Sequence, residues 1–113
     1  NLEFKKSIKK FDIITKNLKH NQKLVIYGIS STAMRFLNYL DKLSLKKISY
    51  LADSDKRIKN KKFKNKKIIT TEEFKKIYRI NDLIVVIKAV RGKPILEFLI
   101  KKLNFPKKNI FIV

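Results

Sequence analysis

The chain contains no cysteine and no tryptophan, and it has only two glycines, two prolines and one histidine among 113 residues. The lack of cysteine excludes disulfides and thiolate chemistry and is typical of proteins of the reducing cytoplasm. No apolar run approaches the roughly 20 residues that a membrane-spanning helix needs. The first residues, NLEFKKSIKK, lack the apolar core of a signal peptide. We therefore expect a single cytoplasmic domain, since this length suffices for one core but not for two.

Recognisable catalytic patterns are missing as well. The single histidine, His20, has no partner at a spacing typical of metal ligands. No tyrosine is followed four residues later by the lysine expected of a short-chain dehydrogenase or epimerase. Neither a G-x-S-x-G elbow nor a Walker lysine motif occurs, and Asp and Glu together number nine. We expect no metal site and no catalysis by this chain alone.

Acidic residues are outnumbered by 29 lysines and arginines, which gives a net charge of +20. Such a charge suggests nucleic acid or an anionic surface as a partner. Only four of the basic residues are arginine, however, whose planar fork binds phosphate best. Abundant lysine, asparagine and isoleucine instead indicate the bias of AT-rich codons. Residues 56–67 (KRIKNKKFKNKK) are interpreted as a solvated loop, with phosphate and stacking contacts through its lysines and Phe63 as the alternative.

Hydrophobic periodicity predicts alternating strands and helices. Residues 2–19 form an amphipathic helix that precedes the first strand. The most continuously apolar run, LIVVIK at 83–88, is typical of a strand buried on both faces of a parallel sheet. The predicted strands are 23–27, 47–52, 68–69, 83–88 and 109–113. The predicted later helices are 32–43, a helix capped by Thr70 or Thr71 that ends at 79, and 92–103.

This alternation predicts an α/β fold with right-handed crossovers. We expect a Rossmann-like three-layer sandwich with a parallel five-stranded sheet in the order 3-2-1-4-5 and an extra N-terminal helix at 1–22. The domain proper is then 23–113. The first and fourth strands are neighbours where the chain reverses direction, and ligands of such sheets bind at that point, outside the carboxyl ends of the strands.

The stretch KLVIYGISSTA at 23–33 is the centre of the predicted site. Gly28, Ser30 and Ala33 occupy the three positions of a G-x-G-x-x-G/A dinucleotide fingerprint, so one glycine of the motif is present. A strand, a glycine and a capped helix direct backbone N–H groups and a positive helix end toward bound phosphate. Asp53 follows the second strand about 25 residues later, near the distance expected of an acid that holds a ribose hydroxyl.

Eight candidate binding residues follow from this placement: Gly28, Ile29, Ser30, Ser31, Asp53, Ser54, Asp55 and Arg91. Each has a purely structural alternative. The glycine serves as a helix-entry turn, the serines cap the helix, and the aspartates turn a loop. Arg91 and the nearby Lys93 are alternatively plain solvated charges.

Five segments together resemble a Rossmann-like family attached to bacterial polysaccharide and glycan biosynthesis proteins. They are KLVIYGISSTAMRFLNYL, ISYLADSDKRIKNKKF, IITTEEFKK, DLIVVIKA and KKLNFPKKNIFIV. The most specific parts are DSDK at 53–56 and IITTEE at 68–73. The chain departs from the family at Ser30 and Ala33, where two glycines are usual, and at Asn60 in the loop.

The resemblance implies a nucleotide, nucleotide-sugar, NAD or coenzyme A site at Gly28 and Asp53. It also implies attachment to sugar-nucleotide dehydratases, sugar acyltransferases, methyltransferases or glycosyltransferases. We expect a nucleotide-type binding domain cut from a longer protein, with other domains of the same polypeptide as partners and a homodimer left open. The alternatives are a structural or interaction domain with a vacant crevice, or a basic nucleic-acid-binding module.

Overall fold

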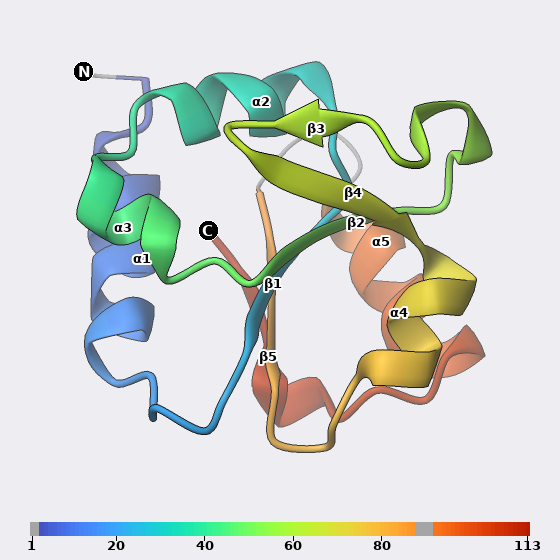
Figure 1. Ribbon diagram of the computed structural model, residues 1–113. Helices are drawn as coiled ribbons and strands as arrows, with labels where there is room; N and C mark the ends of the chain where they lie inside the picture. The colour runs from blue at the N-terminus through green and yellow to red at the C-terminus, as the bar shows by residue number, and fades with distance from the viewer. Residues whose placement is uncertain (1–2, 88–91) are drawn as a thin grey trace.

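Six strands form one mixed sheet in the order β3-β4-β2-β1-β5-β6 (Figure 1). The computed structural model describes residues 3–87 and 92–113. The parallel strands are β1 (Leu24–Tyr27), β2 (Tyr50–Asp53), β4 (Lys66–Thr70), β5 (Leu83–Val86) and β6 (Ile110–Ile112). The predicted order of these five strands is confirmed, and β1 and β5 are neighbours where the chain reverses direction.

The expectation of a purely parallel, five-stranded sheet is wrong, because a sixth strand, β3 (Lys62–Phe63), pairs antiparallel with β4. The segment 62–67, expected in a loop, is a hairpin. Lys64 and Asn65 make its two-residue turn, with φ of 53° and 62°, which matches the twist of antiparallel strands. Phe63 is partly buried and packs against the core.

Helices cover both faces of the sheet (Figure 1). One face carries α1 (Lys5–Lys16), α2 (Ser31–Asn38) and α3 (Lys42–Lys46). The other carries α4 (Thr71–Ile77) and α5 (Gly92–Glu97), which continues as the π-helical turn η2 (Phe98–Lys102). Short 3₁₀ turns are η1 (Lys56–Ile58) and η3 (Lys107–Asn109).

The central strands divide the core in two. Leu24 and Ile26 of β1 face the first helical layer, while Val25 and Tyr27 face the second. All four residues of β1 and of β5 are buried, as expected of strands in the middle of a parallel sheet. This rigid centre places the carboxyl end of β1 beside that of β2.

Several predicted boundaries shift. The helix expected at 32–43 is two helices, because Asp41 starts α3 by accepting a 2.8 Å hydrogen bond from the Ser44 N–H. The strand expected at 47–52 is β2 at Tyr50–Asp53, although the Ser49 N–H already donates to the Leu24 carbonyl at 2.8 Å and Ile48 is buried. Residue 88, expected at the end of a strand, lies outside the described residues.

Candidate functional site

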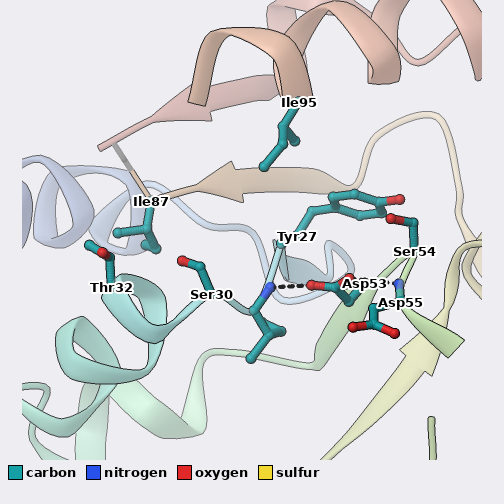
Figure 2. Close-up of a pocket in the computed structure, with 10 residues that line it drawn as sticks. Tyr27, Ser30, Thr32, Asp53, Ser54, Asp55, Ile87 and Ile95 are labelled. Carbon is teal, nitrogen blue, oxygen red and sulfur yellow. Dashed lines mark hydrogen bonds between the residues drawn. The ribbon is translucent and has the colours of Figure 1, made fainter. Parts of the chain in front are cut away.

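A cavity of about 450 Å³ opens at the carboxyl ends of β1 and β2 (Figure 2). Its walls are Tyr27, Gly28, Ile29, Ser30, Thr32, Asp53, Ser54, Asp55, Ile87 and Ile95. Six of the eight candidate residues therefore line one cavity. Ser31 does not line it, and Arg91 lies outside the described residues. Four further lining residues were not predicted from the sequence: Tyr27, Thr32, Ile87 and Ile95.

Gly28 makes the turn at the end of β1. Its φ is +89°, a conformation that favours glycine, and its N–H donates to the Ala52 carbonyl at 2.8 Å. A Cβ at this position would lie 3.0 Å from Cδ1 of Ile95. Ile95 extends from α5 toward this turn (Figure 2). The glycine is thus required by the fold itself, whether or not a ligand binds.

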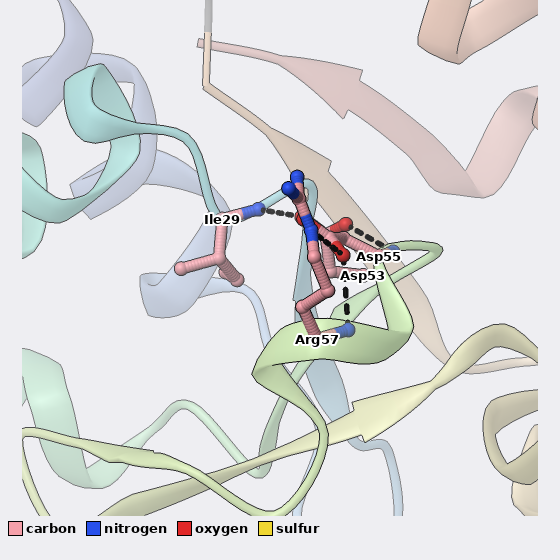
Figure 3. A network of polar contacts seen from close by, with 4 residues as sticks. All are labelled: Ile29, Asp53, Asp55 and Arg57. Atoms are coloured by element: carbon pink, nitrogen blue, oxygen red, sulfur yellow. Dashed lines mark hydrogen bonds and ion pairs between the residues drawn. The ribbon is translucent and has the colours of Figure 1, made fainter.

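The Asp53 carboxylate joins the loops that follow β1 and β2 (Figure 3). Its Oδ2 accepts the Ile29 N–H at 2.6 Å, and its Oδ1 accepts the Asp55 N–H at 2.8 Å. Each carboxylate oxygen has a second lone pair. Asp53 therefore holds the backbone in place and keeps capacity for one further hydrogen bond at each oxygen.

Asp55 is bound by Arg57, which was not among the predicted site residues. Its Oδ1 accepts the backbone N–H of Arg57 at 3.0 Å, and its Oδ2 accepts Nη2 of Arg57 at 2.9 Å (Figure 3). The hydrogen bond from the Arg57 side chain lowers the pKa of Asp55, and the same contact raises the pKa of Arg57. The signal for this pair was an Asx turn followed by a basic residue within DSDKR. Arg57 supplies positive charge beside an otherwise acidic wall.

Ser30 is the N-cap of α2, and its Oγ accepts the Ala33 N–H at 3.1 Å. The hydroxyl hydrogen of a capping serine can still be donated to a ligand. The first-turn N–H groups of a helix lack intrahelical acceptors, and the helix dipole adds positive potential there. This end of the cavity is suited to negative charge, with Thr32 beside it.

Three further lining residues are Tyr27 beside Ser54, Ile87 beside Thr32, and Ile95 (Figure 2). The hydroxyl of Tyr27 hydrogen-bonds that of Thr71, which begins α4. Burial raises the pKa of Tyr27. Ile87 and Ile95 add apolar surface. The cavity thus has an apolar side, a carboxylate side and a helix N-terminus.

Comparison with protein-family models, curated proteins and solved structures found no match to the chain. Within residues 3–87 and 92–113, no group of three or more His, Cys, Asp or Glu side chains is arranged to hold a metal ion. Over the same residues, no helix has the length and apolar character needed to cross a membrane. Fold and cavity together define an α/β domain with a crevice at the carboxyl ends of its central strands.

Proposed function

We propose that the chain is a Rossmann-like binding domain, in the cytoplasm, for a nucleotide-type ligand such as a nucleotide sugar, NAD or coenzyme A. The observation that supports it is the single cavity that brings the Gly28 turn, the N-terminus of α2 and Asp53 together. The five parallel strands with helices on both faces support the three-layer description. Membership of a surface-glycan biosynthesis protein rests on the sequence resemblance alone.

In this proposal each wall of the cavity binds a different part of the ligand. Phosphate oxygens accept hydrogen bonds from the first turn of α2 and from the Ser30 hydroxyl. A ribose hydroxyl donates to the free lone pairs of Asp53. The ring system packs on Ile87 and Ile95. The domain then positions or regulates a catalytic domain elsewhere in the parent protein.

A second candidate is an interaction domain whose crevice holds no ligand. Ile95 reaches the space directly above Gly28, which is where a pyrophosphate approaches the fingerprint glycine. Both Asp53 oxygens already accept backbone hydrogen bonds. Both observations favour a crevice whose residues stabilise the fold and bind no ligand.

Amide NMR separates the two candidates. NAD, coenzyme A and a uridine-diphosphate sugar are titrated singly into the ¹⁵N-labelled chain, and saturable shifts are expected for Ile29, Ser30 and Ser54. Ser30→Asp keeps a competent N-cap but adds negative charge at the phosphate position, so binding should weaken roughly tenfold or more. Ser49→Asp, an exposed position outside the cavity, is the charge-matched control and should bind normally.

The absence of shifts with all three ligands contradicts nucleotide binding in this cavity and supports the second candidate. Shifts that survive Ser30→Asp unchanged contradict phosphate binding at the first turn of α2.

A further inference from the structure

The two edges of the sheet differ in chemistry. The β3 edge is short and carries lysine, as native proteins often arrange to prevent unwanted strand pairing. The β6 edge reads Ile-Phe-Ile and is followed by Val113, without a charge. Within the described part of the chain, β6 is paired on one side only, with β5. Among the described residues both edge strands are unpaired on their outer side, and the β6 edge is the one without a lysine to disfavour a further strand.

The direction of the backbone N–H and C=O groups of β6 shows which of them can pair with an added strand. The Val113 N–H donates to the Val86 carbonyl at 3.0 Å, so residue 113 points its backbone groups toward β5. Alternate residues of a parallel strand bond to opposite sides. Ile110 and Ile112 accordingly direct their N–H and C=O groups away from β5. These are the groups to which an added strand pairs.

An apolar groove of about 250 Å³ follows this edge. It is lined by Phe111, Ile112 and Val113 on one side and by Lys10, Ile13 and Ile14 of α1 on the other. Side chains of successive strand residues alternate between the two faces, yet three successive residues line the groove. The groove thus runs along the edge rather than on one face. Ile13 is 63% exposed within it.

The surroundings of the groove are strongly basic. Lys10 lines it, and exposed lysines lie one helical turn from Ile13 at Lys9 and Lys16. Lys107 and Lys108 lie in η3, the turn directly before β6. Asp12 is the one acid of α1. A second copy of the chain, at +20 each, would bring lysine against lysine, which disfavours pairing.

We propose that the β6 edge and the groove bind an extended segment of a partner protein, one that adds as a strand and has acidic residues flanking its apolar ones. The backbone of the partner pairs with Ile110 and Ile112, as in strand addition to a sheet edge. Its apolar side chains enter the groove beside Ile13, and its carboxylates meet the surrounding lysines. This surface is separate from the cavity at Gly28 and Asp53, so the proposal does not depend on nucleotide binding.

The test uses two synthetic peptides of about nine residues, the length of a long strand. Both alternate valine and threonine, and one is flanked by glutamates and the other by lysines. Titration of the ¹⁵N-labelled chain with the glutamate peptide should shift the amides of Ile112, Val113 and Ile13. The lysine peptide should bind at least tenfold more weakly at low salt.

Ile13→Ser should weaken the glutamate peptide roughly fivefold, because an exposed apolar contact is lost while the fold is unaffected. Leu43→Ser is the matched control, since Leu43 is 72% exposed on α3, and it should leave binding unchanged.

Three results overturn the proposal. One is the absence of shifts at β6 with the glutamate peptide. Another is equal binding of both peptides or equal weakening by both serine variants. The third is a dimer in sedimentation velocity that Ile13→Ser dissociates, because the occupant of the edge is then a second copy.

Discussion

The backbone N–H of Ile29 and the carboxylate of Asp53 are joined by a 2.6 Å hydrogen bond that spans the two loops at the mouth of the cavity (Figure 3). This hydrogen bond forms within the chain and needs no ligand. Asp53 accepts a second backbone N–H, from Asp55, so one side chain stabilises both loops at once.

Asp53→Asn should therefore destabilise the chain even without ligand. Asparagine has one acceptor oxygen where the carboxylate has two, so one backbone N–H faces an amide NH₂ group. We expect a loss of about 1.5–3 kcal/mol in the free energy of unfolding, the range for hydrogen bonds to charged groups. Urea unfolding followed by circular dichroism measures it. Asp12→Asn, on the exposed surface of α1, removes the same charge and should change stability little; equal stability of both variants would contradict the structural role of Asp53.

Gly28→Ala tests whether the turn after β1 requires glycine, both for its backbone conformation and for its contact with Ile95. A Cβ at φ +89° is strained, and it would approach Cδ1 of Ile95 at 3.0 Å. We expect a loss of about 1–3 kcal/mol, as for other residues in sparsely populated backbone conformations. Thermal or urea unfolding of Gly28→Ala, of Ile95→Val and of the double variant separates the two causes. Ile95→Val should recover the steric part only, and full recovery would show that the backbone conformation costs nothing.

The parts of the fold that follow from local sequence were predictable. The order of the parallel strands follows from alternating apolar runs and helices, such as LVIY in β1 and LIVV in β5. The cap of α4 was visible in the Thr-x-x-Glu pattern, and Thr70 and Glu73 do form a capping box. The strand β3 was hidden, because its turn uses Lys64 and Asn65 without a glycine and its anchor, Phe63, packs against distant residues.

The same distinction applies to the cavity. Gly28 and Asp53 were predictable because a turn glycine and an acid at a strand end are signals within the chain. Tyr27 and Ile95 were not, because their roles depend on which face of β1 is turned toward α5. Contacts between elements far apart in sequence decide that orientation, and a single sequence contains no local sign of them.

Two tyrosines with buried hydroxyl groups should respond in opposite ways to the loss of those groups. Burial raises the pKa of both. The Tyr27 hydroxyl bonds Thr71, whereas the Tyr78 hydroxyl has no hydrogen-bond partner among the described residues. Tyr27→Phe leaves the Thr71 hydroxyl unpaired and should cost about 1–3 kcal/mol. Tyr78→Phe should be neutral or stabilising by up to about 1 kcal/mol, and urea unfolding of the pair measures both; a substantial loss at Tyr78 would show a bond to its hydroxyl.

Stability should decrease in acid through Glu73. Its Oε1 accepts the Thr70 N–H at 3.2 Å, and this backbone hydrogen bond lowers the pKa of Glu73 below 4.5. A carboxyl whose pKa is lower in the folded state stabilises the fold above its unfolded pKa, and the contribution is lost as pH falls through the folded pKa. Glu73→Gln should therefore destabilise the chain at about pH 7, and this deficit should shrink as the pH is lowered below about 4. Glu72→Gln, on the same turn, controls for the loss of charge near the helix N-terminus; a deficit for Glu73→Gln that persists unchanged in acid would contradict the mechanism.

Two lysines face each other across the β3–β4 hairpin, and their repulsion should destabilise it. Lys62 and Lys67 are directly opposite partners in the antiparallel β3–β4 pair, and both are exposed. Like charges facing each other across strands destabilise a sheet. Lys62→Glu converts the repulsion into attraction and should stabilise the chain by about 0.2–1 kcal/mol at low salt. The gain should shrink at about 1 M salt, where the screening length falls to roughly 3 Å. Lys19→Glu makes the same change in net charge at an exposed position outside the sheet; if it stabilises the chain equally, the benefit comes from the lower total charge and not from the facing pair.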